Sequence, residues 1–243
     1  MIESTAQERL DGPRPELLDA PPSTPPAPID DVGALAVPVG RPAVTTTTIR
    51  PDQRPPMPLT AAVIGDSIAK SAREVVTDSI ELEGVEVIAY DAEESRRMAV
   101  WGGRGLSSGV AAIDGVLDDD LEPELWVVAL GTNDVGAGTD PATVQDHIDE
   151  VLDEIPDDAD LFWVDTWVRD LEDRTDLFNV MIRDRLADRP NSWVLDWNTL
   201  AATDGLIIPD GVHLTPRGQL EFARMIGRAL RDGFNLPRRA DTP

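Results

Sequence analysis

The feature that most constrains the fold is an alternation, from residue 59 onward, of short apolar runs with longer amphipathic stretches. Short apolar runs are typical of parallel strands buried on both faces, and amphipathic stretches between them are typical of covering helices. The predicted strands span residues 61–65, 85–90, 125–130, 161–167 and 192–197. The predicted helices span residues 68–80, 106–118, 141–154, 174–188 and 215–231. We therefore expect an α/β fold: a three-layer α/β/α sandwich around a five-stranded parallel sheet of flavodoxin-like topology.

Proline separates the segment that precedes this pattern from the rest of the chain. Residues 1–58 hold 13 of the 21 prolines. Proline interrupts helices, and a segment so poor in large apolar side chains buries little surface. We predict a Pro/Thr-rich disordered tail or linker at residues 1–58, one domain at residues 59–236 and a short C-terminal tail at residues 237–243.

The last predicted helix carries an apolar stripe. Residues spaced by three and four positions share one face of a helix. We expect this stripe to lie in the core; its members are Leu220, Ala223, Ile226, Ala229 and Leu230.

The charge balance excludes nucleic acid as a partner. The chain has 46 acidic and 21 basic residues and a net charge of −25, so phosphate backbones and anionic lipid surfaces would repel it. Cysteine is absent, which removes disulfides, thiolate catalysis and Cys-ligated metal sites.

The sequence predicts no membrane span in this chain and no export signal. The N-terminus lacks a basic region followed by an apolar stretch, and about eighteen consecutive apolar residues occur nowhere. Read literally, this indicates a cytoplasmic protein, whereas the Pro-rich segment is similar to an extracytoplasmic spacer. Both compartments stay open.

Polar residues with catalytic potential follow most of the predicted strands. Carboxyl ends of parallel strands meet at one edge of a sheet, where such folds bind ligands. The segments are Gly65-Asp66-Ser67, DAEESRR at 91–97, Gly131-Thr132-Asn133-Asp134, and Asp210-Gly211-Val212-His213 in the loop after the last strand.

Ser67 has two interpretations. Ser and Asp commonly cap a helix by accepting a hydrogen bond from its first turn. Alternatively, Ser67 is a nucleophile on a tight strand-to-helix turn, where the helix N-terminus favours developing negative charge.

The other segments supply the partners that a nucleophilic serine needs. A turn at 210–213 would let the Asp210 carboxylate reach one ring nitrogen of His213, leaving the other nitrogen as a base. The backbone N–H of Ser67 and the amide of Asn133 are candidate donors to the oxyanion of an acyl-transfer intermediate.

These residues resemble three of the four sequence blocks of the SGNH (GDSL-type) hydrolases, in order and over roughly residues 60–232. The resemblance implies the SGNH hydrolase fold, a nucleophile at Ser67, a base at His213, its carboxylate at Asp210 and an oxyanion hole that includes Asn133.

The second block departs from the family pattern. The family usually has glycine after the second strand, and Ser95 or Arg96 stands there in this chain. A backbone N–H needs no particular side chain, so Ser95 remains a candidate donor. Gly102 and Gly103 are rivals further along.

DAEESRR and the Pro-rich lead also look similar to the SGNH domains attached to bacterial membrane acyltransferases that O-acylate surface glycans. This resemblance implies a membrane acyltransferase as a partner and a small-molecule or glycan ester as substrate.

Several residues near the predicted edge keep two interpretations. Arg96, Arg97 and Arg104 either hold an anionic substrate group or pair with nearby acids. Three tryptophans either pack in the core, the preferred interpretation, or form a sugar-stacking wall; they are Trp101, Trp167 and Trp197.

Two further features are interpreted as non-catalytic. His147 lies among carboxylates on a predicted surface helix and is expected to be solvated. The run Asp118-Asp119-Asp120 is expected to be a hydrated loop, and no metal is predicted.

The hypothesis is a serine esterase or O-acyltransferase that works through an acyl-enzyme without a cofactor, on short acyl esters of carbohydrates. A catalytically silent binding or docking module is the alternative. A nucleotide- or flavin-binding domain is disfavoured because no glycine-rich phosphate-binding motif follows a strand.

Overall fold

The computed structural model describes residues 54–101 and 107–234. Its sheet confirms the predicted fold class, with five parallel strands in the order β2-β1-β3-β4-β5. The strands are β1 (Thr60–Gly65), β2 (Glu86–Ala92), β3 (Leu125–Ala129), β4 (Asp160–Val164) and β5 (Ser192–Leu195). Most of the predicted tail at 1–58, and all of 237–243, lie outside the described residues.

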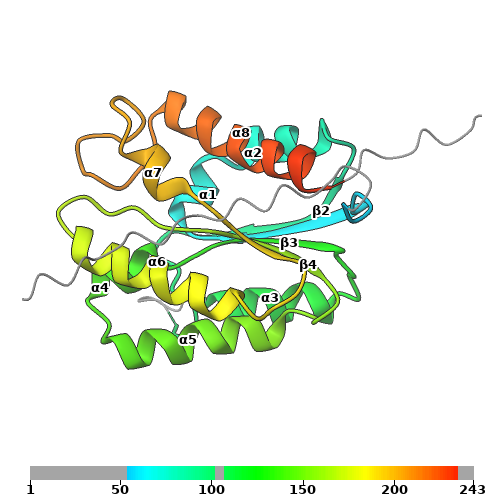
Figure 1. Cartoon of the computed structure of the whole chain (residues 1–243), viewed down its shortest axis with the longest axis horizontal. Coiled ribbons are helices and arrows are strands. Elements are labelled where there is room, and N and C mark those ends of the chain that lie inside the picture. Colours follow the sequence, from blue (N-terminus) through cyan, green and yellow to red (C-terminus); the bar gives the residue numbers. More distant parts are fainter. Residues whose placement is uncertain (1–53, 102–106, 235–243) are drawn as a thin grey trace, which may run out of the picture. The chain divides into compact units, whose positions relative to one another are not determined.

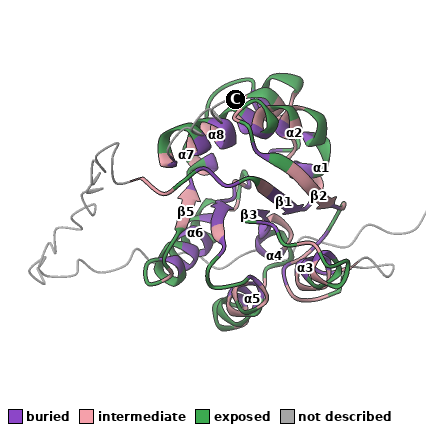
Figure 2. Ribbon diagram, turned by 90° about the vertical axis from the view of Figure 1, so that its right-hand side faces the viewer, coloured by how far each residue is buried: buried purple, intermediate pink, exposed green. Residues whose placement is uncertain are grey.

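Helices cover both faces of the sheet (Figures 1 and 2). On one face lie α1 (Ser67–Ser71), α2 (Arg73–Glu81), α7 (Trp197–Ala201) and α8 (Pro216–Gly233). On the other lie α3 (Gly109–Asp118), α4 (Thr132–Ala137), α5 (Pro141–Glu154) and α6 (Glu172–Leu186). Within the described residues, no helix has both the length and the apolar character needed to span a membrane.

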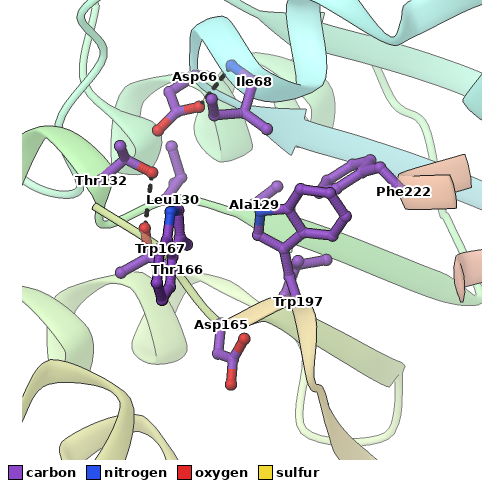
Figure 3. Close-up of a pocket in the computed structure, with 11 residues that line it drawn as sticks. Asp66, Ile68, Ala129, Leu130, Thr132, Asp165, Thr166, Trp167, Trp197 and Phe222 are labelled. Carbon is purple, nitrogen blue, oxygen red and sulfur yellow. Dashed lines mark hydrogen bonds between the residues drawn. The ribbon is translucent and has the colours of Figure 1, made fainter. Parts of the chain in front are cut away.

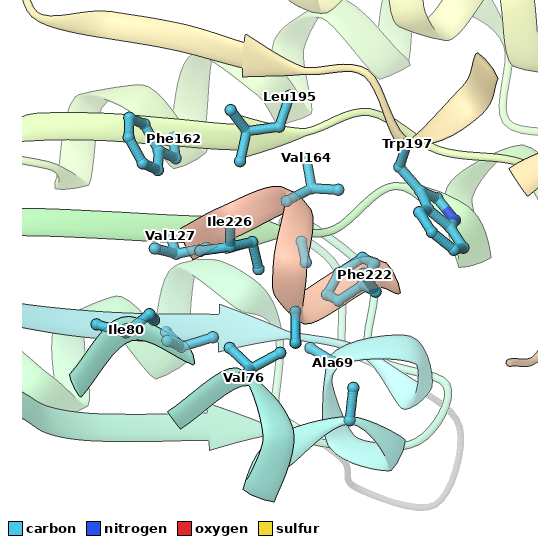
Figure 4. Close-up of a cluster of buried hydrophobic side chains, with 14 of the residues drawn as sticks. Ala69, Val76, Ile80, Val127, Phe162, Val164, Leu195, Trp197, Phe222 and Ile226 are labelled. Carbon is cyan, nitrogen blue, oxygen red and sulfur yellow. The ribbon is translucent and has the colours of Figure 1, made fainter. Parts of the chain in front are cut away.

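Each face of the sheet has its own hydrophobic core, because side chains alternate along each strand. In β3, Val127 packs beneath α2 and α8 with Ile80 and Ile226 (Figure 4), whereas Trp126 and Val128 belong to the opposite core. All three β3 residues are fully buried. The central strand therefore reads as a continuous apolar run in the sequence.

The predicted stripe on the last helix is partly wrong. Ala223, Ile226 and Leu230 are buried, but Leu220 is 44% exposed and Ala229 is only partly buried. Phe222, which the stripe omitted, is buried. The buried face is centred between Phe222 and Ala223, and Leu220 and Ala229 lie about a quarter turn to either side of it.

The predicted helix at 68–80 is two helices, because the chain breaks at Ala72, whose ψ of 7° is not helical. The short helices α4 and α7 were not predicted. The predicted strand at 161–167 ends at Val164, after which Thr166 bonds to the side chain of Asn179 instead of a neighbouring strand.

Candidate active site

The turn between β1 and α1 presents Ser67. A Cβ on Gly65 would lie 2.3 Å from the Cβ of Ala69, so only glycine lets the chain turn this tightly into α1. The N-cap of α1 is Asp66, whose Oδ1 accepts from the N–H of Ile68 at 2.9 Å. Asp66, not Ser67, therefore supplies the capping bond, and the Ser67 hydroxyl is left for another partner.

That partner is His213. The Oγ of Ser67 lies 3.0 Å from Nε2 of His213, and Nδ1 of the same ring lies 2.7 Å from Oδ2 of Asp210. With Nδ1–H donated to Asp210, Nε2 accepts the Ser67 hydroxyl. The side chains of His213 and Asp210 are 46% and 43% exposed, so an incoming molecule can reach this line of groups.

A tight turn holds Asp210 and His213 together. The other carboxylate oxygen of Asp210 accepts from the backbone N–H groups of Val212 and His213 at 2.9 and 3.0 Å. Burial would raise the pKa of Asp210, but these two N–H groups and the His213 ring outweigh it and hold the pKa below its ordinary value. Asp210 therefore stays ionised beside the imidazole.

Gly211 fits this turn to the loop that follows β4. Its φ of +81° lies in the left-handed region that glycine favours. A Cβ there would come within 2.5 Å of the Cβ of Arg169, whose N–H donates to the Gly211 carbonyl at 3.0 Å. On the other side, the N–H of Ile208 donates to the His213 carbonyl at 2.8 Å. These two backbone hydrogen bonds hold in place the loop that carries the imidazole.

Asn133 reaches the same edge from the first turn of α4. The N-cap of the helix is Gly131, with φ +117°, where a Cβ would meet the ring of Phe178 at 2.0 Å. The Nδ2 of Asn133 donates to the carbonyl of Arg96 at 2.9 Å and lies 3.5 Å from Oδ2 of Asp66. One amide hydrogen is therefore well bonded, and the other is held only weakly.

The second-block segment lies beside Asn133. Ser95 is exposed and has a φ of +61°, the backbone conformation that glycine favours. Within the described part of the chain, the N–H groups of Ser95 and Arg96 have no hydrogen-bond acceptor. The rival donors Gly102 and Gly103, together with Arg104, lie outside the described residues.

The structure places the remaining arginines and tryptophans in different surroundings. Arg96 and Arg97 pair with acids, at 2.8 Å from Asp91 and 3.2 Å from Asp134. Trp197 is buried, Trp167 is partly buried and Trp101 is 70% exposed. The preferred core interpretation therefore fits Trp197 and is wrong for Trp101.

The prediction that His147 is solvated is wrong. Its side chain is buried, and Nδ1 lies 3.4 Å from Oδ1 of Asp134. Val144, Ile148 and Val151 form the buried stripe of α5, and His147 falls within that stripe. This helical spacing was visible in the sequence, but the surrounding carboxylates dominated its interpretation.

Asp66 lines a small cavity of about 10 Å³ beneath the Ser67 turn (Figure 3). Burial raises the pKa of Asp66 to about 6, despite the opposing hydrogen bonds from Ile68 and Thr132. The hydroxyls of Thr132 and Thr166, which line the same cavity, are hydrogen-bonded to each other at 2.8 Å. The turn that carries Ser67 thus contains a buried carboxyl that takes up a proton more readily than an exposed one.

We predict that Asp66→Asn stabilises the protein at neutral pH and not in acid. The folded-state pKa of about 6 exceeds the ordinary 3.8, so wild-type stability falls as pH rises through that window. Asparagine keeps an oxygen for the Ile68 N–H and carries no charge. The melting temperature of Asp66→Asn minus that of wild type should therefore increase between about pH 4 and 6 and then level off.

Asp140→Asn is the control for this prediction. Asp140 is an exposed N-cap that accepts from the N–H of Thr143 at the start of α5, and its hydrogen bonds with Thr143 hold its pKa below the ordinary value. Because the folded-state pKa is lowered, not raised, its melting-temperature difference should not increase between about pH 4 and 6. A flat curve for Asp66→Asn as well would show that burial does not shift the Asp66 carboxyl.

Among residues 54–101 and 107–234, no cluster of three or more His, Asp or Glu side chains is arranged to hold a metal ion. The run Asp118-Asp119-Asp120 is exposed at the end of α3.

Among known proteins, this chain is similar to solved structures only. No family model matches the chain, and no curated protein matches it. A lipase/acylhydrolase from Enterococcus faecalis superposes with a TM-score of 0.60 at 17% identity, covering 74% of this chain and 98% of that one. The C-terminal catalytic domain of Streptococcus pneumoniae peptidoglycan O-acetyltransferase A gives 0.56 at 18% identity, covering 74% and 95%.

A third structure is Est24, a carbohydrate acetylesterase from Sinorhizobium meliloti, with a TM-score of 0.56 at 13% identity, covering 71% of this chain and 98% of that one. These structural neighbours are SGNH/GDSL hydrolases. The fold expected from the three sequence blocks is therefore confirmed: the chain has the α/β fold of that family.

Proposed function

We propose that this chain is a serine-dependent esterase or O-acyltransferase that acts on short acyl esters of carbohydrates through an acyl-enzyme. The observation that carries the proposal is the continuous line of contacts from Ser67 Oγ through the His213 ring to Asp210, at 3.0 and 2.7 Å. A hydroxyl, an imidazole and a carboxylate in this order are the parts of a general-base-activated nucleophile.

In the first half of the proposed reaction, Ser67 Oγ attacks the ester carbonyl carbon while Nε2 of His213 takes the hydroxyl proton. Asp210 stabilises the imidazolium that forms. The tetrahedral intermediate then collapses, the ester C–O bond breaks, and the leaving alkoxide takes the proton from Nε2. The acyl group remains on Ser67.

In the second half, water or a sugar hydroxyl gives its proton to Nε2 and attacks the acyl carbon. Ser67 leaves and recovers the proton from His213. Attack by water gives hydrolysis, and attack by a hydroxyl gives transfer. The exposed imidazole supports access by either acceptor.

The oxyanion of both tetrahedral intermediates needs fixed donors. Ser67 is the first residue of α1, so its backbone N–H has no acceptor within the helix. The weakly held amide hydrogen of Asn133 is the second donor, and the Ser95 N–H, which has no acceptor in the described structure, is the third.

The carbohydrate substrate class rests on similarity. Two of the structural neighbours are, by name, a peptidoglycan O-acetyltransferase domain and a carbohydrate acetylesterase. A short acyl group on a sugar is therefore the first substrate to test.

The test is pre-steady-state hydrolysis of 4-nitrophenyl acetate, followed by acetylated oligosaccharides. We expect a burst of one nitrophenolate per protein molecule, as acyl-enzyme accumulates. An added sugar acceptor should convert part of the acetate into an acetylated sugar if the chain is a transferase. Failure to hydrolyse any ester faster than buffer would contradict the proposal and favour a silent binding module.

We predict that Asn133→Ala lowers kcat by about 10²- to 10³-fold, the usual loss for one oxyanion donor, with little change in KM. The amide stabilises charge that exists only in the transition state, so its removal affects the chemical step. Steady-state kinetics with 4-nitrophenyl acetate measure this. Asn191→Ala is the control, because Asn191 is exposed and directly precedes β5, at the opposite edge of the sheet from the strand ends that lead to Ser67 and Asn133. Equal losses in both variants would contradict the role of Asn133.

A further inference from the structure

Arg96 is a buried charge with a full set of partners. Its side chain is 0% exposed, and its guanidinium donates five hydrogen bonds. Nη2 donates to the carboxylate of Asp91 at 2.8 Å and to Oγ of Ser107 at 2.9 Å. A buried guanidinium persists only when its donors are satisfied and its charge is balanced. This site therefore specifies arginine, not just a basic residue.

The guanidinium joins three segments that are separated along the chain. Nη1 donates to the carbonyl of Asp91, in β2, at 2.8 Å and to that of Gly65, the last residue of β1, at 3.3 Å. Nε donates to the carbonyl of Ser107, directly before the N-cap of α3, at 3.4 Å. Gly65 stands two residues before Ser67, so one side chain ties the second-block segment to the nucleophile turn.

The backbone of Arg96 faces the proposed oxyanion hole. Its carbonyl accepts from Nδ2 of Asn133 at 2.9 Å, the shorter of the two hydrogen bonds of that amide. The two residues that follow are anchored on Asp134, through Arg97 Nε at 3.2 Å and the Met98 N–H at 3.1 Å. The position of the Arg96 carbonyl therefore determines which way the Asn133 amide points.

We propose that Arg96 is a positioning residue: its buried guanidinium fixes the second-block segment so that its own carbonyl orients the amide of Asn133 toward the oxyanion. This inference rests on the proposed function. It also explains how the chain functions without the family's glycine in the second block. Ser95 takes up the left-handed backbone at a conformational cost, and the neighbouring arginine holds it there.

The kinetic test is a double-mutant cycle between Arg96→Lys and Asn133→Ala. Lysine keeps the charge and loses the forked geometry. We expect Arg96→Lys to lower kcat about 10- to 100-fold, less than deletion of the donor itself, with KM nearly unchanged. In the double variant the loss should be much smaller than the product of the two single losses, because Arg96 acts mainly through Asn133 and otherwise only through the Ser95 N–H that it also holds. Additive losses would overturn the proposal.

Arg189→Met is the matched control. Arg189 lies in the loop before β5, away from the Ser67 turn. Its side chain is only 10% exposed and donates to the carbonyl of Pro156 at 2.6 Å. It should lower the melting temperature and leave kcat within a factor of about two, as expected of a site distant from the chemistry. A similar loss of kcat in Arg96→Lys and Arg189→Met would mean that Arg96 acts only through general stability.

A second readout does not depend on activity. The side-chain amide protons of Asn133 can be assigned by NMR from their absence in Asn133→Ala. They should shift in Arg96→Lys and stay unchanged in Arg189→Met. If the wild-type protein hydrolyses no ester, the proposed function fails, yet these signals still decide whether Arg96 orients Asn133. Unchanged signals in folded Arg96→Lys would overturn the inference.

Asp91→Asn replaces Arg96→Lys if the latter does not fold. Asp91 is 44% exposed, and its carboxylate is the nearest charge partner of Arg96. Asparagine leaves the guanidinium less well balanced. We expect a smaller decrease in kcat in the same direction and a smaller shift of the Asn133 amide protons; the absence of both would count against the proposal.

Discussion

Ser67→Ala is expected to lower kcat/KM for 4-nitrophenyl acetate by roughly 10⁴- to 10⁶-fold, the loss typical of a deleted serine nucleophile. Without Oγ no acyl-enzyme forms, and the burst of nitrophenolate should disappear. The fold should be unaffected, because the capping bond of α1 comes from Asp66. Stopped-flow kinetics and thermal melting of the same samples measure both effects.

Ser71→Ala is the matched control for the nucleophile. Ser71 lies on the same short helix, and its hydroxyl donates to the Ile68 carbonyl at 2.8 Å. Its removal should leave kcat/KM within a factor of about three, as for most substitutions away from the reacting groups. Full activity in Ser67→Ala would exclude Ser67 as the nucleophile.

His213→Gln is expected to lower kcat/KM by about 10⁴-fold or more, because the base that takes the Ser67 proton is lost. Steady-state kinetics with 4-nitrophenyl acetate measure this loss, and thermal melting of the same sample shows whether the variant is folded.

The control for His213 is the other histidine. His147→Gln changes a buried ring that packs beside Asp134 and does not contact Ser67, so we expect a lower melting temperature with kcat/KM within a factor of about three of wild type. A loss of kcat/KM in folded His147→Gln as large as that in His213→Gln would contradict the assignment of His213 as the base.

The sequence predicts the sheet well because buried parallel strands leave an unmistakable apolar pattern. All five strands were located within a few residues, and the edge at which their carboxyl ends meet followed from topology. Three segments with reactive side chains were therefore expected at one edge, and Ser67, Asn133 and His213 do lie at that edge.

Other features could not be read from local pattern. The short helices α4 and α7 span six and five residues, too few for a helical period to stand out. Arg96 is charged but completely buried, which depends on partners from β1, β2 and the start of α3. Burial of a charged side chain is decided by such distant contacts and not by its neighbours in sequence.

His147 and Asp66 are two further polar residues whose burial could not be predicted from their neighbours in sequence. The carboxylates around His147 indicate a solvated face, yet its helical position and its contact with Asp134 place it inside. In the sequence, the capping interpretation was given to Ser67, and the structure shows that the neighbouring Asp66 performs this role while fully buried.

The proposed line from Ser67 through His213 to Asp210 is tested most directly by covalent labelling with a fluorophosphonate probe, mapped by mass spectrometry. We predict one probe per folded molecule, attached to Ser67, with no labelling of Ser67→Ala and much slower labelling of His213→Gln. Folded wild-type protein that takes up no probe, or takes it up at another residue, would contradict the proposed active site.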